Sequence, residues 1–176
     1  LGDGEAPEWF DAVANLGVGV ERRPVGAEQL LATSASFHWV SRTADLDADG
    51  DLDLVSAWAD YTLWWHENLG LGVFGPERSI DAATGFLLDI RVLDLDADGD
   101  LDIAAADLTT GSAGVWWNDG TGAFGPAAVA ALLPGASDLE AADLDADGLP
   151  DLALVSDVTD SVAVADWRSA FFFRSA

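Results

Sequence analysis

Short apolar segments of extended type, separated by turns, make up most of the chain. Residues 37–42 are aromatic and β-branched, and residues 52–58 mix apolar and polar positions in partial alternation. Two further segments of this kind cover residues 61–65 and 73–80, and glycine and proline separate them. No segment shows the 3.6-residue period of an amphipathic helix. The pattern therefore predicts an all-β chain in which these four segments form one unit.

The same plan recurs further along the chain. The corresponding segments of the second and third units are residues 86–93, 101–106 and 115–117, and residues 139–142, 152–155 and 162–164. We therefore expect a lead-in that contains part of a preceding unit (1–36), repeat 1 (37–85), repeat 2 (86–136) and an incomplete repeat 3 (137–176). Because a part-unit stands at either end and the first residue is not methionine, we expect a processed product or a segment of a longer chain.

An acidic sequence of nine residues joins the first two segments of every unit. Residues 45–53 read D-L-D-A-D-G-D-L-D, residues 94–102 repeat this letter for letter, and residues 143–151 read D-L-D-A-D-G-L-P-D. The three copies start 49 residues apart. A fixed period of this length is the signature of a repeat architecture, with one acidic loop in each unit.

The spacing of acidic residues in this loop is that of a calcium-binding loop. Aspartates at positions 1, 3, 5 and 9 offer hard oxygen ligands from alternate residues, glycine at position 6 allows a sharp turn, and position 7 offers its backbone carbonyl. The glutamate of an EF-hand is missing at position 12, where Ser56, Ala105 and Leu154 stand. We therefore predict about three Ca²⁺ ions in loops that are not EF-hands.

The candidate metal-binding residues are Asp45, Asp47, Asp49, Asp51 and Asp53; Asp94, Asp96, Asp98, Asp100 and Asp102; and Asp143, Asp145, Asp147, Leu149 and Asp151. Leu149 stands at position 7, where the other two loops have aspartate, which favours a carbonyl ligand at that position.

Composition narrows the classes of partner. The net charge of −25 would repel nucleic acid and anionic membrane surfaces, so neither is expected as a partner. The lack of cysteine excludes disulfides and thiol chemistry, and two histidines are too few for zinc or copper sites. No apolar run approaches the roughly 18 residues that membrane insertion needs.

Other candidate sites have simpler explanations. The tryptophan pairs at 64–65 and 116–117 could form a sugar-stacking platform, but a blade covered on both faces would place them in the core, which we favour. We expect His66 in a solvated turn and His38 as a hydrogen-bonded structural histidine. The chain has no G-x-S-x-G, H-E-x-x-H or glycine-rich phosphate loop, so we expect no catalytic site.

The endings of the first two units add a further motif. Residues 64–76 read W-W-H-E-N-L-G-L-G-V-F-G-P, and residues 116–126 read W-W-N-D-G-T-G-A-F-G-P. Together with the three loops, these endings make most of residues 37–167 resemble the FG-GAP/VCBS repeats of integrin-α-like β-propellers.

The resemblance implies blades of four antiparallel strands, with calcium in the loop between the first two strands of each blade. Carried over by position, the ligands are the aspartates at positions 1, 3, 5 and 9. Three loops are too few for a closed ring, so we expect a partial propeller of about three to four blades, completed by other blades or chains.

The expected function is a calcium-stabilised module that binds proteins or glycans in adhesion. Calcium at millimolar concentration suits such loops, so we expect the module outside the cytosol: extracellular, on a cell surface, or in a secretory or organelle lumen. Two alternatives stay open. The chain could be a non-catalytic module of a larger secreted hydrolase or lyase, or a structural subunit of a large assembly.

Overall fold

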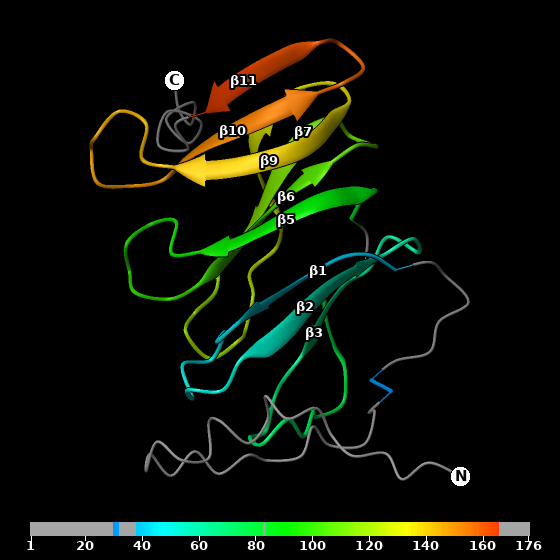
Figure 1. Ribbon diagram of the computed structural model, residues 1–176, viewed down its shortest axis with the longest axis vertical. Coiled ribbons are helices and arrows are strands. Elements are labelled where there is room, and N and C mark those ends of the chain that lie inside the picture. Colours follow the sequence, from blue (N-terminus) through cyan, green and yellow to red (C-terminus); the bar gives the residue numbers. More distant parts are fainter. Residues whose placement is uncertain (1–29, 32–37, 83, 166–176) are drawn as a thin grey trace, which may run out of the picture.

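The computed structural model describes residues 30–31, 38–82 and 84–165, and these residues form eleven β-strands (Figure 1). The strands are β1 (His38–Ala44), β2 (Asp53–Trp58), β3 (Leu63–His66), β4 (Arg78–Asp81), β5 (Leu87–Leu93), β6 (Asp102–Asp107), β7 (Ser112–Trp116), β8 (Ala128–Leu132), β9 (Ala136–Ala142), β10 (Asp151–Ser156) and β11 (Ser161–Ala165). They pair in chain order into three antiparallel sheets, which we name blade 1 (β1–β4), blade 2 (β5–β8) and blade 3 (β9–β11).

The blades follow one another along the molecule, with their first strands side by side. Figure 1 shows β1, β5 and β9 in succession, and the structure brings β5 into contact with both of its neighbours. Sheets that meander outward from adjacent inner strands are the arrangement of a β-propeller. The predicted all-β fold and its partial propeller are therefore confirmed. Within the described part of the chain, no helix is long and apolar enough to cross a membrane.

Two apolar cores hold the blades together. Val55 and Trp65 of blade 1 pack with Ile90 and Ile103 of blade 2 in the first core. In the second, small residues on the opposite face of blade 2 pack against leucines of blade 3; the small residues are Ala104, Ala106 and Ala113, and the leucines are Leu139, Leu152 and Leu154. Because blade 2 is covered on both faces, every residue of β6 is buried. The predicted core role of the two tryptophan pairs is confirmed for Trp65 and Trp116, whereas Trp64 and Trp117 are half-buried.

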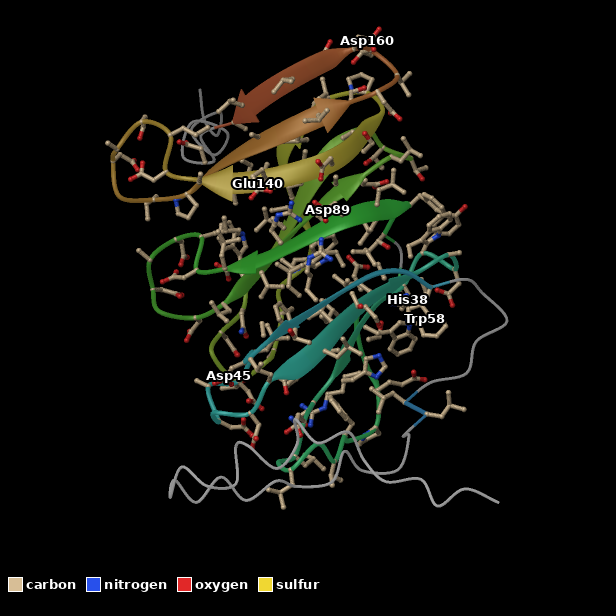
Figure 2. All side chains as sticks on the ribbon, in the orientation of Figure 1. His38, Asp45, Trp58, Asp89, Glu140 and Asp160 are labelled. Carbon is tan, nitrogen blue, oxygen red and sulfur yellow. The ribbon has the colours of Figure 1, made fainter. Side chains whose placement is uncertain are left out.

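Ion pairs link the inner strands of the three blades. Arg42 of β1 lies 2.5 Å from the buried Asp89 carboxylate of β5, and Arg91 of β5 lies 2.6 Å from Glu140 of β9. Asp89 also accepts a hydrogen bond from the backbone N–H of Leu139 at 3.3 Å. Figure 2 labels Asp89 and Glu140 on these neighbouring strands. Each junction between blades thus combines an apolar core with an arginine–carboxylate pair at its inner end.

Several local predictions need correction. Residues 73–77 do not belong to the fourth strand, because β4 begins at Arg78 and Phe74 forms an isolated bridge to Asn68 outside the strands. β8 was not predicted, since its sequence is rich in alanine and has Val129 as its one β-branched residue and no aromatic residue. The predicted repeat boundaries stay predictions, and the expected lead-in and the end of repeat 3 fall mostly on residues 1–29, 32–37 and 166–176, outside the described residues.

The expectation of a solvated turn at His66 is wrong, because this residue ends β3 and is 2% exposed. Its Nε2 atom lies 3.1 Å from the Ser56 hydroxyl oxygen, which also accepts a hydrogen bond from Trp58 Nε1 at 3.0 Å. Burial lowers the pKa of the His66 imidazole. His38 is exposed and meets the Trp58 ring edge to face at 5.8 Å between centroids. Both histidines therefore belong to an aromatic and polar packing group of blade 1.

A glycine of blade 2 allows the first junction to close. A Cβ atom added to Gly122 would lie 2.1 Å from the Trp65 ring, whereas one added to Gly72, at the same place in blade 1, would meet nothing within 4 Å. Both glycines have a φ of +73°. The two positions therefore differ in the room available for a side chain but not in backbone conformation.

We expect Gly122→Ala to destabilise the chain more than Gly72→Ala. Both substitutions place alanine in the left-handed region at a cost of about 1 kcal/mol. Gly122→Ala should cost roughly 1–3 kcal/mol more, because Trp65 is locked in the core and must move. Urea unfolding of the two variants measures the difference. Equal losses of stability would contradict the packing of Trp65 on Gly122.

Candidate metal centre

The three acidic loops lie along one edge of the molecule. Each connects the first two strands of its blade, and Figure 1 shows the three loops on the same side, one above the other. Figure 2 labels Asp45 at the start of the first loop. In each of the first two blades, the residue before the loop pairs with position 9 of the loop: Ala44 lies opposite Asp53, and Leu93 lies opposite Asp102. The chain therefore reverses at the same point of the repeat, which places the loops on the same edge.

The aspartate at position 1 organises the turn. In the first loop, the two carboxylate oxygens of Asp45 accept hydrogen bonds from the backbone N–H groups of Asp49 and Gly50 at 3.1 and 3.0 Å. Asp143 holds the third loop in the same way, at 3.1 and 3.0 Å. These hydrogen bonds from backbone N–H groups fix the curl of the chain, and no lysine or arginine side chain takes part in them.

The backbone of all three loops is also strained at the same place. The alanines at position 4 have φ values between 57° and 63°, and the glycines at position 6 have φ values between 94° and 101°. The left-handed region is unfavourable for alanine, by roughly 1–2 kcal/mol per residue. Three repeats of one unfavourable conformation indicate that the loops share a common, tightly determined shape.

Each loop brings carboxylate oxygens together. In every loop, three carboxylates have one oxygen each within 4.8 Å of the others; the groups are Asp45, Asp47 and Asp49, then Asp94, Asp96 and Asp102, then Asp143, Asp145 and Asp151. Groups of this kind could hold a metal ion, and their oxygen-only donors suit a hard cation. The assignment of individual ligands stays a prediction, with positions 1 and 3 present in all three groups.

Two buried oxygens in these groups lack a hydrogen-bond donor. Asp47 Oδ1 and Asp94 Oδ1 are both inaccessible to solvent and have no hydrogen-bond partner. An acceptor buried in this way is costly unless a donor or a cation reaches it. Burial, followed by repulsion from the neighbouring Asp49, raises the pKa of Asp47, and burial with repulsion from Asp98 raises that of Asp96. The carboxylates thus fit a cation held at the centre of the loop.

The aspartate at position 9 has a structural task as well. The carboxylate of Asp102 accepts hydrogen bonds from the N–H groups of Leu95, at 3.1 Å, and Asn118, at 2.9 Å. Asp53 binds Leu46 and Asn68 in the same way, at 3.1 and 2.8 Å. In the first two loops, position 9 therefore ties the start of the loop to the turn that follows the third strand of the blade, and in the third loop Asp151 accepts from the N–H of Leu144 at 2.9 Å. Burial raises the pKa of Asp102 to about 6.

The side chains at position 7 lie apart from these groups. A Cβ atom added to Gly120 would stand 2.6 Å from the Asp100 carboxylate oxygens, and one added to Gly70 would stand 3.2 Å from Asp51 Oδ2. These carboxylates therefore face the turn after the third strand. In the third loop Leu149 is buried at this position. This placement is compatible with the predicted role of the position-7 backbone carbonyl.

Two asparagines were missed in the analysis of the sequence. Asn118 donates its side-chain amide to the carbonyl oxygens of Leu101, at 3.0 Å, and of Leu46 in the loop of blade 1, at 2.7 Å. Asn68 donates to Leu52 in its own blade at 3.0 Å. The signal was present, since both asparagines precede the glycine-rich turn that ends in F-G-P. Only the structure reveals that Asn118 reaches the loop of the preceding blade.

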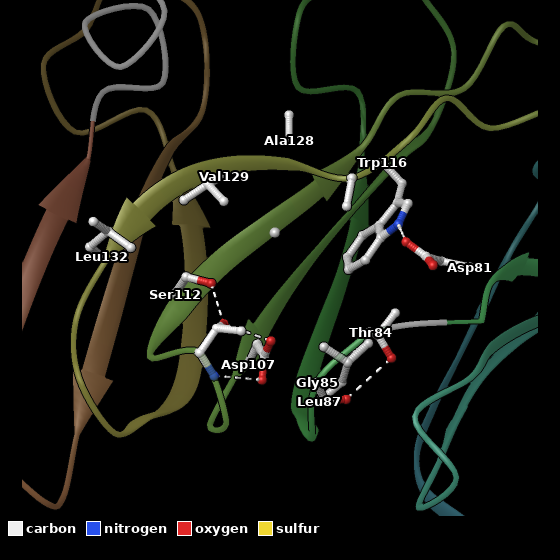
Figure 3. A pocket seen from close by; sticks show the side chains of 13 residues that line it. Asp81, Thr84, Gly85, Leu87, Asp107, Ser112, Trp116, Ala128, Val129 and Leu132 are labelled. Carbon is white, nitrogen blue, oxygen red and sulfur yellow. Dashed lines mark hydrogen bonds between the residues drawn. The ribbon is translucent and has the colours of Figure 1, made fainter.

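A cavity of about 240 Å³ lies beside β7 and β8, next to the link between β4 and β5 (Figure 3). Two carboxylates line it. Asp81 accepts a hydrogen bond from Trp116 Nε1 at 3.0 Å, and Asp107 accepts one from the Thr110 hydroxyl at 2.6 Å. Asp107 also accepts from the backbone N–H of Thr109 at 2.8 Å. Both acids stabilise the structure around them, which explains their presence without a catalytic role.

The raised pKa of Asp102 gives the calcium-free chain a defined pH dependence. Between its ordinary pKa of 3.8 and the folded value of about 6, the folded chain holds a proton that the unfolded chain has released. The stabilisation that this proton gives the folded chain is fully present below pH 3.8. As the pH rises through about 6, the free energy of unfolding falls by roughly 2–3 kcal/mol. We expect Asp102→Asn to remove this decline, as measured by urea unfolding in EGTA across that range.

The exposed Asp157→Asn variant is the matched control and should keep the decline of the parent chain. Because asparagine cannot accept both N–H groups, Asp102→Asn will also lower stability at every pH. The informative quantity is therefore the change of unfolding free energy with pH. The same change in the parent and in Asp102→Asn would contradict the assignment.

Comparison with known proteins agrees with this geometry. A family model described as "FG-GAP-like repeat" matches the chain twice, at residues 45–105 and 94–154. A search among curated proteins found no match. Each family match begins at position 1 of one acidic loop and extends beyond the next loop, so it spans the repeating unit. Because the two matches together cover residues 45–154, which is more than half of the chain, the protein belongs to the FG-GAP-like repeat family.

Proposed function

We propose that the protein is a calcium-stabilised propeller segment that binds proteins or glycans outside the cytosol. The observation that carries the proposal is the convergence of carboxylate oxygens in three equivalent loops, two of them with a buried oxygen that lacks a donor. Calcium accepts six to eight oxygen ligands in flexible geometry, whereas Mg²⁺ needs a tight octahedron and retains its waters. The loop, with several carboxylates and carbonyls, favours calcium.

In this proposal calcium neutralises carboxylates that otherwise repel one another. Two charges about 4 Å apart repel by roughly 4 kcal/mol at an effective dielectric constant of 20. The chain's own residues shape the site: position 1 fixes the curl of the loop and position 3 brings a further oxygen. Position 5 joins them in the first loop, and position 9, which also anchors the loop to the blade, joins them in the other two. The ion therefore stabilises a hairpin of the scaffold, and the binding surface lies elsewhere on the blades.

The family supports a binding role and an extracellular setting. FG-GAP-like repeats build modules that are generally non-catalytic, and they are typical of extracellular proteins. Extracellular calcium is millimolar, which suits sites that lack the bidentate glutamate of an EF-hand. The acidic surface, with a net charge of −25, favours protein or glycan partners over nucleic acid.

Calcium should raise the thermal stability of the chain. A ligand present at about 100 times its dissociation constant stabilises the folded state by roughly 2.7 kcal/mol per site. We therefore expect a clear increase of Tm in millimolar calcium over excess EGTA, measured by differential scanning calorimetry. Millimolar magnesium is the control and should have a smaller effect. The same Tm in calcium and in EGTA would refute calcium stabilisation.

Two variants of one loop should separate the ligand positions. Asp47→Asn removes a position-3 carboxylate with a buried, unpartnered oxygen, so we expect isothermal titration calorimetry to show one calcium site weakened at least tenfold. Asp51→Asn alters a carboxylate that faces Gly70, so it should leave the calcium affinity of all three sites within a factor of about three of the parent chain. Equal losses in the two variants would contradict the proposed geometry.

The binding role needs its own experiment. The intact chain, loaded with calcium, is screened against a glycan array and against purified extracellular matrix proteins, and assayed for hydrolysis of the same glycans. Saturable binding without turnover is the expected result. Catalytic turnover would overturn the proposal in favour of an enzyme, and no binding to any glycan or protein would favour a purely structural subunit.

A further inference from the structure

The side chain of Asn118 connects the acidic loops of blades 1 and 2. Its amide donates hydrogen bonds to the carbonyl oxygens of Leu46, at 2.7 Å, and of Leu101, at 3.0 Å. Leu46 is position 2 of the first loop, and Leu101 is position 8 of the second. Figure 1 shows the yellow-green connection between β7 and β8, which contains Asn118, beside the first loop. Asn118 is 6% exposed, so these hydrogen bonds lie away from water. One buried side chain is therefore shared by two loops.

In the first loop, the carbonyl that Asn118 holds lies between two members of the candidate metal group. Leu46 stands between Asp45 and Asp47, which both belong to that group. The Leu46 side chain is buried in the core between blades 1 and 2, and its N–H donates to Asp53 at 3.1 Å. Because Leu46 is held by its N–H, its carbonyl and its side chain, its position fixes where the two neighbouring carboxylates stand.

In the second loop, the backbone of the same asparagine holds a member of the candidate metal group directly. The carboxylate of Asp102 accepts a hydrogen bond from the N–H of Asn118 at 2.9 Å. One oxygen of Asp102 converges with oxygens of Asp94 and Asp96. Asn118 thus contacts a metal group of the second loop through its backbone and the backbone of the first loop through its side chain.

The turn that carries Asn118 is packed against both blades. The side-chain oxygen of Asn118 accepts hydrogen bonds from the N–H groups of Gly120 and Gly122, at 3.2 and 3.1 Å. Gly120 lies against the Asp100 carboxylate of the second loop, and Gly122 lies against the Trp65 ring of blade 1. A shift of either loop therefore reaches a closely packed turn that the other loop also contacts.

We propose that Asn118 is a positioning residue that couples the metal sites of the first two loops, so that an ion in one loop raises the calcium affinity of the other. This inference rests on the proposed role of calcium. Ordering one loop fixes Leu46 or Asp102, and the shared asparagine then fixes its other partner. The second loop consequently loses less conformational entropy when it binds its own ion. The coupling is reciprocal, so each site raises the affinity of the other by the same factor.

Electrostatic interaction between the two sites acts in the opposite direction. A cation in one loop removes part of the negative field that attracts a second cation to the neighbouring loop. This field decays over about 8 Å at an ionic strength near 0.15 M, whereas buried hydrogen bonds are not screened in this way. At that ionic strength we therefore expect positive coupling, of about fivefold in affinity.

Blade 1 supplies a matched asparagine for comparison. Asn68 donates its amide to Leu52 at 3.0 Å, accepts from the N–H of Gly70 at 3.2 Å, and donates its own N–H to Asp53 at 2.8 Å. Within the part of the chain that the structure describes, Asn68 donates to no carbonyl of another loop. It therefore has the local contacts of Asn118 without the bond between loops.

Three glycines can report the three sites separately. Gly50, Gly99 and Gly148 stand at position 6 of their loops, and each donates its N–H to the aspartate at position 1, at 3.0, 3.1 and 3.0 Å. The first experiment is a calcium titration of the intact chain at the same ionic strength, followed by the amide signals of these glycines in ¹H–¹⁵N NMR spectra. It yields one affinity for each loop.

Disabling the first site should weaken the second site through Asn118. In Asp47→Asn we expect the affinity at Gly99 to fall about fivefold and the affinity at Gly148 to stay within a factor of about two. Asn118→Asp keeps the oxygen that holds the turn but removes both donors. In that background, Asp47→Asn should change the affinity at Gly99 by less than about twofold. The matched Asn68→Asp variant adds the same charge and should keep the full effect.

The outcomes separate this inference from the proposed function. If none of the three glycines responds to calcium, the proposed calcium binding is wrong, and the coupling with it. If they respond but Asp47→Asn leaves the affinity at Gly99 unchanged, calcium binding stands and the coupling is wrong. An effect at Gly99 that persists in Asn118→Asp, or equal losses at Gly99 and Gly148, would also overturn the role of Asn118.

A second experiment needs no substitution at Asn118. In Asp96→Asn, which disables the second site, calcium should still slow amide hydrogen exchange at Gly122 by about threefold or more, because the acceptor of this N–H is Asn118 Oδ1. A variant that combines Asp47→Asn with Asp96→Asn is the control and should show no slowing. Unchanged exchange at Gly122 in Asp96→Asn would overturn the inference even if Asn118→Asp did not fold.

Discussion

The buried aspartate at the end of each loop is the interaction on which the rest of the structure depends. Asp102 accepts backbone N–H groups from Leu95, at the start of its loop, and from Asn118, after the third strand of its blade. One carboxylate therefore fixes three segments that are distant in sequence. Charged groups are rarely buried unless hydrogen bonds compensate for lost hydration, and two N–H donors meet this need in part. The pKa of about 6 shows that the compensation is incomplete.

The same aspartate connects the loops to the junctions between blades. Leu95, whose N–H it holds, is fully buried in the core between blades 2 and 3, and Asn118 donates its amide to Leu46 in the loop of blade 1. A cation that orders one loop would thereby also order the leucine that fills the next junction. Each junction in turn combines this leucine with an inner arginine–carboxylate pair. The loops are thus part of the mechanism by which neighbouring blades hold one another.

Much of this organisation could be predicted from the sequence, because the acidic loop and the strands that flank it recur together with a period of 49 residues. The loop spacing placed Asp45, Asp94 and Asp143 at equivalent turns, and the family motif gave the meander of strands. The motif could not show that position 9 divides its carboxylate between two backbone groups, since this depends on contacts 15 or 16 residues away. β8 escaped prediction because pairing with β7, and not intrinsic β-propensity, places its three alanines in a sheet.

Charge and apolar surface are separated in the molecule, and this separation bears on function. Fourteen of the 32 acidic residues lie in the three loops along one edge, where three carboxylates of each loop converge and a bound cation would neutralise them. Exposed apolar side chains of the described residues lie instead on the sheet of blade 3, among them Val155, Val162 and Val164. A partner that recognised the loops would compete with calcium for the same oxygens. A partner that bound elsewhere on the blades would leave every loop free to hold its ion.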